Sequence, residues 1–138
     1  MVWGAISGQG VGPLHRCTGN VNQNVYRAIL VGYLTHRQFV QDNAPCHKAN
    51  LIRGWMIGND VHAMPWPSCS PDLNPIEQVW AWMKRQIQGK HFANKDALWH
   101  ELSSLWLRMS PDFVQRFVDS MPRRVKAVIE AKGGVTRY

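Results

Sequence analysis

The sequence has no apolar run near the ~20 residues that a membrane-spanning helix needs, so no membrane association is expected. Its first residues lack the basic start and the apolar stretch of a signal peptide. Its three cysteines are an odd number without regular spacing, which argues against a disulfide framework and indicates a reducing compartment. Charged residues are also scarce, at 18%, whereas 45% of the 138 residues are hydrophobic. This balance excludes intrinsic disorder and predicts one domain's worth of chain with a buried core.

Acidic residues are the scarcer charge: nine Asp and Glu stand against sixteen Lys and Arg, which gives a net charge of +7. Five of the basic residues fall within positions 122–138, where Glu130 is the only acidic residue. They are Arg123, Arg124, Lys126, Lys132 and Arg137. Such a basic surplus fits a polyanionic partner, most often nucleic acid. It fits a solvated helix with a basic bias equally well, so charge alone does not decide between the two.

The first half of the chain predicts alternating strands and helices. The expected elements are strands over 1–7 and 11–17 joined as a hairpin, a helix from about residue 21 to 33, a strand over 38–41, a helix over 47–57 and a strand over 61–64. Asn20 is the expected cap of the first helix. Its expected inward positions are Val25, Ile29 and Tyr33.

The second half predicts helices only. An apolar stripe begins the series, with Ile76, Trp80, Met83 and Ile87 at helical spacing. The three helices after it are expected to begin at Asn94, Ser110 and Ser120. The whole order predicts an α/β fold in which a mixed sheet with flanking helices over 1–90 is followed by a C-terminal helical extension of the same domain over 91–138.

Asp42 directly follows the expected strand over 38–41. Ligands of α/β proteins gather at the carboxyl ends of strands, and a charged group placed there needs a partner or a metal. Asp42 could equally close a turn with Asn43, Ala44 and Pro45, because Asp side chains bond to backbone N–H groups in such turns. Both interpretations stay open from this segment alone.

Glu77 lies at the start of the helix after a proline-rich segment, residues 65–75, which holds four prolines in eleven residues. These prolines restrict the backbone that leads to Glu77, as a preorganised site requires. The alternative is a rigid connector in which Asn74 and Glu77 form a capping box around Pro75. The two roles of Glu77 do not exclude each other.

Several motifs then coincide at characteristic spacings. They are Gln41-Asp42-Asn43-Ala44-Pro45-Cys46-His47, Trp66-Pro67-Ser68, Ser70-Pro71-Asp72-Leu73-Asn74-Pro75-Ile76-Glu77, Val2-Trp3-Gly4, Met121-Pro122-Arg123-Arg124 and Lys132-Gly133-Gly134. With thirty-four residues between Asp42 and Glu77, the chain resembles the Tc/mariner group of DDE transposases over essentially its whole length.

The resemblance implies an RNase H-like catalytic domain in which two Asp and one Glu hold two divalent metal ions. By motif, Asp42 is the second carboxylate and Glu77 the third. Hard oxygen ligands favour Mg²⁺ or Mn²⁺, and two such ions activate the attacking and leaving oxygens of a phosphodiester. The implied substrate is double-stranded DNA, at transposon ends and a TA target site. The resemblance also admits a homodimer of the full-length enzyme and implies a nuclear location.

One departure from the family pattern concerns the first carboxylate, which belongs on a strand upstream of Val2-Trp3-Gly4. No Asp or Glu precedes Asp42, so we expect the first catalytic strand to be missing and this chain alone to be inactive. The segment between Tyr33 and Phe39 is also shorter than the family leads one to expect. The alternative function is a decayed or domesticated remnant that at most binds DNA or an intact transposase weakly.

The remaining candidates concern DNA contacts. His47 follows the second carboxylate motif, where a cap or a DNA-backbone contact is a better expectation than a metal ligand. Trp66 is the aromatic residue most expected at the DNA. The expected basic contacts are Arg123, Arg124, Lys126, Lys132 and Arg137, which predict a weak, salt-sensitive affinity.

Overall fold

The computed structural model describes residues 1–33 and 38–138. The described chain divides into two compact units: the first is Met1–Val2 with His15–Ser70, and the second is Trp3–Leu14 with Pro71–Tyr138. The expected shortening between Tyr33 and Phe39 falls on residues outside the described ranges. The predicted division at residue 90 lies inside the second unit and stays a prediction.

The hairpin at the start of the chain is confirmed. Strand β1 (Val2–Ser7) pairs with β2 (Gly10–Arg16), and Ser7 Oγ accepts a hydrogen bond from the backbone N–H of Gln9 in the turn (3.1 Å). Gly10 adopts φ +119°, a conformation that a residue with a Cβ rarely takes. The glycine-rich turn predicted from sequence therefore has a steric basis.

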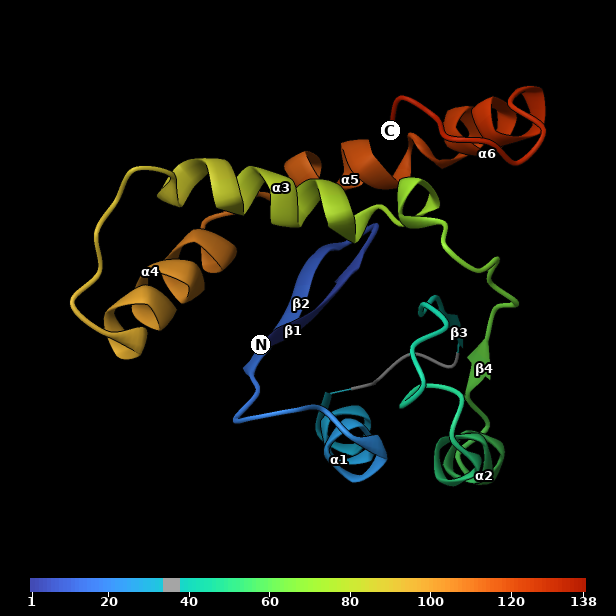
Figure 1. Ribbon diagram of the computed structural model, residues 1–138, viewed down its shortest axis with the longest axis horizontal. Coiled ribbons are helices and arrows are strands. Elements are labelled where there is room, and N and C mark those ends of the chain that lie inside the picture. The colour runs from blue at the N-terminus through green and yellow to red at the C-terminus, as the bar shows by residue number, and fades with distance from the viewer. Residues whose placement is uncertain (34–37) are drawn as a thin grey trace. The chain divides into compact units, whose positions relative to one another are not determined.

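The first unit contains two helices and a short parallel pair of strands (Figure 1). Its elements are α1 (Gln23–Tyr33), β3 (Gln38–Phe39), α2 (Asn50–Gly58) and β4 (His62–Ala63). Phe39 pairs with Ala63 in register, and Met64 N–H donates to the Phe39 carbonyl (3.0 Å). Helices α1 and α2 pack together, and their buried residues are Tyr26, Ile29, Leu30, Ile52 and Met56.

The boundaries of α1 and α2 differ from the prediction for local reasons. Helix α1 begins at Gln23 because Asn22, and not Asn20, is its cap: Asn22 Oδ1 accepts the N–H groups of the second and third residues that follow it. Its buried face is made by Tyr26, Ile29 and Leu30, whereas Tyr33 is exposed. Helix α2 begins at Asn50 because residues 45–47 form a separate turn.

The second unit packs four α-helices and a short 3₁₀ turn against the hairpin residues it includes (Figure 1). Its elements are η1 (Pro71–Leu73), α3 (Ile76–Ile87), α4 (Lys95–Leu107), α5 (Pro111–Val118) and α6 (Met121–Glu130). The buried core consists of Val79, Met83, Leu105, Trp106, Met109 and Val114. The predicted stripe of α3 packs around this core rather than forming its centre, because Ile76, Trp80 and Ile87 are only partly buried.

Trp106 connects helix α4 to the hairpin. It is 1% exposed, and its indole Nε1–H donates to the Gly12 carbonyl (2.8 Å). It stacks on Trp80, with ring centroids 5.2 Å apart. Gly4 allows this approach, since a Cβ there would lie 2.9 Å from ring atoms of both tryptophans. Trp106 is thus the largest fully buried side chain of the described residues, and its N–H is satisfied by a hydrogen bond.

Two of the three caps predicted for the last three helices are confirmed. Asn94 Oδ1 accepts the N–H groups of Asp96 and Ala97, and Ser110 Oγ accepts that of Phe113, with Pro111 at the first helical position. Ser120 is not a cap of this kind. Its backbone is already helical, and its Oγ donates to the Phe117 carbonyl (2.6 Å) instead.

Within the described residues, the strands form two two-stranded sheets, β1–β2 and β3–β4. Two pieces of sheet fit the expectation of a mixed sheet that lacks its first catalytic strand. Strand β3 is shorter than predicted, since it ends at Phe39, three residues before Asp42. No helix of the described chain has the length and apolar character to cross a membrane.

Candidate functional site

The Asp42 loop belongs to the first unit and follows β3. Asp42 Oδ1 accepts the backbone N–H of Ala44 (3.0 Å), so the turn-forming role expected from sequence is present. The same oxygen lies 2.6 Å from His47 Nδ1. The Asp42 side chain is nevertheless 64% exposed. Asp42 is therefore fixed in direction while its carboxylate faces solvent, which is compatible with binding a ligand.

Helix α1 supports this arrangement through Tyr26. The Tyr26 ring packs on the His47 ring, with centroids 4.0 Å apart, and the Tyr26 hydroxyl donates to Gln41 Oε1 (2.6 Å). Burial raises the pKa of Tyr26 well above its usual value, so the hydroxyl stays protonated and remains a donor. Both ends of the Asp42 loop are thus held to one buried side chain.

Two further side chains complete the loop. Asn43 Nδ2 donates to the Trp66 carbonyl (2.7 Å), which ties the loop to the beginning of the proline-rich segment. Trp66 itself is half-buried. Burial raises the pKa of the Cys46 thiol, and the Asp42 charge acts in the same direction, so Cys46 is neutral at physiological pH. A neutral thiol argues against Cys46 as a metal-binding thiolate.

Glu77 lies in the second unit, in the first turn of α3. Its backbone N–H donates to the Asn74 carbonyl (3.2 Å), and the Asn74 N–H donates to the Pro71 carbonyl (3.0 Å). Asn74 Oδ1 accepts the backbone N–H of Ile76 (3.4 Å). In a capping box it would accept the N–H of Glu77, so the bond expected from Asn74 is made to a different residue. Two successive hydrogen-bonded turns therefore precede the helix and fix the backbone position of Glu77.

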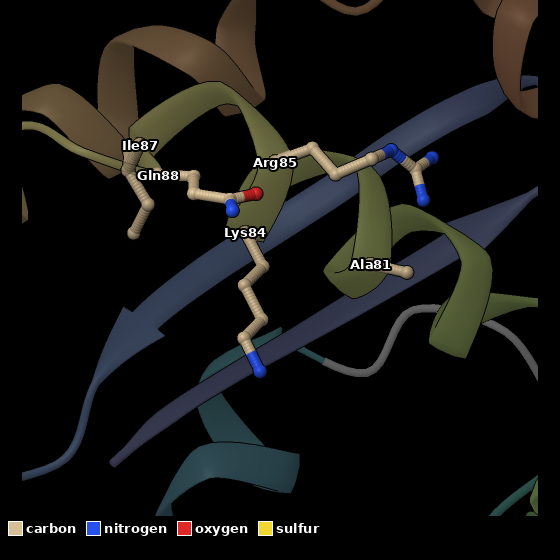
Figure 2. A pocket seen from close by; sticks show the side chains of 5 residues that line it. All are labelled: Ala81, Lys84, Arg85, Ile87 and Gln88. Atoms are coloured by element: carbon tan, nitrogen blue, oxygen red, sulfur yellow. The ribbon is translucent and has the colours of Figure 1, made fainter.

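Helix α3 carries a surface pocket of about 510 Å³ lined by Ala81, Lys84, Arg85, Ile87 and Gln88 (Figure 2). Lys84 and Arg85 extend from the helix as separate positive groups (Figure 2). They lie seven and eight positions after Glu77, and helical periodicity puts these positions on the face that carries Glu77. We did not predict them from sequence, although their spacing from Glu77 would have indicated them.

The basic residues near the C-terminus separate into two groups. Arg123, Lys126, Lys132 and Arg137 are exposed. Arg124 is only 2% exposed, and its guanidinium donates to Ser120 Oγ and to the Asp72 carbonyl. Its predicted role as a DNA contact is wrong for this arrangement, because its charge is already used inside the protein.

No group of three or more His, Cys, Asp or Glu residues within the described ranges could hold a metal ion. Asp42 and Glu77 belong to different units, and each offers the oxygen chemistry that Mg²⁺ or Mn²⁺ prefers. The donor type therefore fits the implied metal, and the assignment of the two residues as its ligands stays a prediction.

Residues 1–99 match the family described as DDE superfamily endonuclease. The chain is 37% identical to the Tcb1 transposase of Caenorhabditis briggsae and 36% identical to the Tc1 transposase of Caenorhabditis elegans, with 100% of this chain and 54% of each relative covered. The chain thus spans about half the length of the curated relatives it matches.

Solved structures of the Mos1 mariner transposase are similar in fold. The Mos1 catalytic domain with Raltegravir and Mg aligns with a TM-score of 0.90 at 20% identity, over 99% of this chain and 76% of that one. The Mos1 strand transfer complex gives 0.88 at 22% identity, over 99% of this chain and 43% of that one. These alignments confirm the predicted RNase H-like α/β fold class.

Proposed function

We propose a function from the premise that this chain belongs to the DDE superfamily endonucleases. The chain is part of a transposase that cuts and joins DNA phosphodiesters at transposon ends with divalent metal ions. The supporting comparisons are the match of residues 1–99 and the Tc1-type transposases among its relatives. We further propose double-stranded DNA with a TA target site as the substrate, a homodimer as the assembly of the full-length enzyme, and the nucleus as its location.

The observation that carries the proposal is the held but exposed carboxylate of Asp42. Oδ1 accepts the Ala44 N–H and lies 2.6 Å from His47 Nδ1, while the side chain is 64% exposed. A carboxylate has lone pairs on both oxygens, so Oδ2 is the atom that we assign to a metal ion. His47 is then a residue that orients Asp42 rather than a ligand, a role that differs from the cap or DNA-backbone contact expected from sequence.

Asp42 and Glu77 would hold the divalent ions together with further ligands. When bound, such ions supply positive charge that stabilises the attacking and leaving oxygens of a phosphodiester. The contribution of the chain is to present both carboxylates in fixed directions, Asp42 through its turn and Glu77 through the turns before α3. We propose that the chain by itself does not cleave DNA, because no Asp or Glu precedes Asp42 to supply the first carboxylate of the family pattern.

Positive charge near Glu77 supports DNA as the substrate. Lys84 and Arg85 lie on the Glu77 face of α3, and Arg123, Lys126, Lys132 and Arg137 are exposed elsewhere in the same unit. Lysine and arginine contacts to phosphates release counterions, so binding should weaken steeply as the salt concentration rises.

Metal binding tests the site directly. Mn²⁺ titration of the purified chain, followed by electron paramagnetic resonance of the free ion, should show weak binding that Asp42→Asn and Glu77→Gln reduce at least tenfold. Asp112→Asn is the matched control, because Asp112 is an exposed carboxylate in the first turn of another helix. If both site variants bind Mn²⁺ as the unchanged chain does, the assignment of Asp42 and Glu77 is wrong.

DNA binding and cleavage test the rest. Fluorescence anisotropy with a TA-containing duplex should give a salt slope that Lys84→Ala and Arg85→Ala each reduce by about 1, whereas Lys95→Ala leaves it unchanged. The chain should not nick supercoiled plasmid in Mg²⁺ or Mn²⁺. If the chain nicks DNA and Glu77→Gln abolishes the nicking, the proposed inactivity is wrong and the assigned site is supported. If the salt slope is unchanged in Lys84→Ala and Arg85→Ala, α3 does not contact DNA.

A further inference from the structure

Asp72, in the turn that precedes α3, is held at two places by the C-terminal part of the second unit. Its backbone carbonyl accepts a hydrogen bond from Arg124 Nη1 (2.6 Å). Its carboxylate Oδ2 accepts one from Thr136 Oγ1 (2.8 Å). The donors lie 52 and 64 positions further along the chain. Such long-range contacts on one residue fix the turn η1 in a way that its own short sequence does not.

Arg124 is unusual among the basic residues because its charge is buried. Its Nε donates to Ser120 Oγ (2.7 Å), which donates onward to the Phe117 carbonyl (2.6 Å). The guanidinium also lies over the Tyr138 ring, 4.8 Å from its centroid. A buried cation is destabilising unless it is paired and hydrogen-bonded, so these partners define a single position for Arg124.

The held turn leads directly to Glu77. Asp72 is the middle residue of η1, and the Asn74 N–H donates to the carbonyl of Pro71 in the same turn. The Glu77 N–H then donates to the Asn74 carbonyl. Pro71 and Pro75 restrict the backbone on both sides of Asp72. A displacement of Asp72 would therefore be transmitted to the start of α3 rather than absorbed by a flexible loop.

We propose that Arg124 and Thr136 are positioning residues for Glu77. They act through Asp72, and the inference rests on the proposed function of Glu77 as a metal ligand. Arg124 restrains the backbone of the turn and Thr136 restrains its side chain, so that the Glu77 carboxylate is presented in one direction. The segment that carries Met121-Pro122-Arg123-Arg124 thereby serves the site from within the protein, whereas its exposed neighbours face solvent.

A purely structural role for Arg124 would give a different result. If Arg124 only stabilises the packing of α6, its loss should lower the protection of amides from hydrogen exchange throughout the second unit. If it positions Glu77, its loss should raise amide exchange selectively at Asn74, Glu77 and Gln78, whose N–H groups donate within the turns before α3. Helix α4 provides the internal reference, since its cap at Asn94 is independent of Asp72.

Hydrogen–deuterium exchange of the whole chain, read by NMR, tests the proposal. Thr136→Val keeps the side-chain shape and removes only the hydroxyl. Arg124→Lys keeps the positive charge, and neither variant leaves a cavity at the buried position. Arg124→Met removes the charge as well and is the more disruptive variant. Exchange at Asn74, Glu77 and Gln78 should rise roughly 3- to 10-fold in Thr136→Val and Arg124→Lys, as the loss of one hydrogen bond predicts, with the α4 amides unchanged. The matched control is Lys126→Met, which alters an exposed cation of the same helix.

The outcomes separate the two proposals. Unchanged exchange in Thr136→Val and Arg124→Lys overturns the positioning role, and so does a uniform rise that includes α4. Mn²⁺ titration of the same variants reports separately on the metal site. If exchange rises selectively but the unchanged chain binds no Mn²⁺, the positioning role of Arg124 and Thr136 stands. The proposed role of Glu77 as a metal ligand is then wrong. If Arg124→Met does not fold, the two conservative variants still decide.

Discussion

The two units hold their candidate carboxylates by different physical means. In the first unit, Asp42 lies in a loop restrained by hydrogen bonds and one ring contact, with Tyr26 as the buried support. In the second unit, Glu77 begins a helix whose inner face joins an apolar core through Val79 and Met83. One carboxylate therefore lies in a loop held by polar contacts, and the other lies on a helix that is anchored by packing in addition to the hydrogen-bonded turn before it.

This difference predicts different sensitivities. Polar contacts have strict geometry, so removal of a single atom can redirect Asp42 while leaving most of the unit's stability. Packing is collective, so a helix such as α3 tolerates surface changes but responds strongly to a cavity. The predictions below test this contrast in order of expected effect.

The largest effect is expected for Trp106→Ala in the second unit. Deletion of a fully buried tryptophan usually lowers the free energy of unfolding by about 3–5 kcal/mol, and here the hydrogen bond to the Gly12 carbonyl is lost as well. Urea denaturation followed by circular dichroism would measure it. Leu107→Ala is the control, because Leu107 is 79% exposed and should change stability by no more than ~0.5 kcal/mol. Equal effects of the two substitutions would contradict the packing described for this unit.

A smaller effect is expected for Tyr26→Phe in the first unit. It removes the hydroxyl that bonds Gln41 and should lower the free energy of unfolding by about 1 kcal/mol, with the ring contact to His47 retained. The same variant should lose less stability at alkaline pH than the unchanged chain does. The pKa of Tyr26 is raised in the folded protein, so the unfolded state releases this proton first and stability falls as pH rises above ~10. Stability curves of both proteins between pH 8 and 11 that decline in parallel would exclude Tyr26 as the cause.

The smallest effect is expected for Lys90→Met in the second unit. Lys90 Nζ lies 2.7 Å from Glu101 Oε1, and this hydrogen bond is the main reason that the pKa of Glu101 is lowered. A lowered carboxyl pKa contributes stability above the unfolded value, near pH ~4.3, and the contribution is lost as pH falls through the folded value. The pair is exposed to solvent, so the thermal midpoint should shift only slightly at pH 7, and the difference in midpoint between the proteins should shrink as pH falls below ~4.3. If the difference in thermal midpoint between the two proteins grows as pH falls, a group other than Glu101 is responsible.

Local features of this chain were predictable from sequence, whereas contacts between distant residues were not. The caps at Asn94 and Ser110 require only neighbouring residues, and both were identified correctly. Asn20 and Asn22 are equally suitable caps by residue type, so residue type alone does not identify Asn22 as the observed cap. The length of a strand such as β3 depends on its partner β4, which is distant in sequence.

The candidate site shows the same limit. Asp42 and Glu77 were recognisable because each lies in a motif of contiguous residues. The turn at Asp42 was predictable because it involves only the residues that directly follow Asp42. The burial of Arg124 was not recognisable, because the carbonyl that accepts its hydrogen bond belongs to Asp72, 52 positions earlier. Five basic residues that look equivalent in sequence thus divide into one internal donor and four exposed charges.

The stack of Trp80 on Trp106 gives the second unit an optical signature of its own. Two indoles with centroids 5.2 Å apart and planes inclined by 22° are close enough for their electronic transitions to couple. Both belong to the second unit, so this coupling is a spectroscopic reporter of that unit alone. Its disappearance during denaturation can be compared with the overall loss of helix signal. Coincident transitions would indicate that the two units unfold together, and separate transitions would show that the chain carries two independently melting parts.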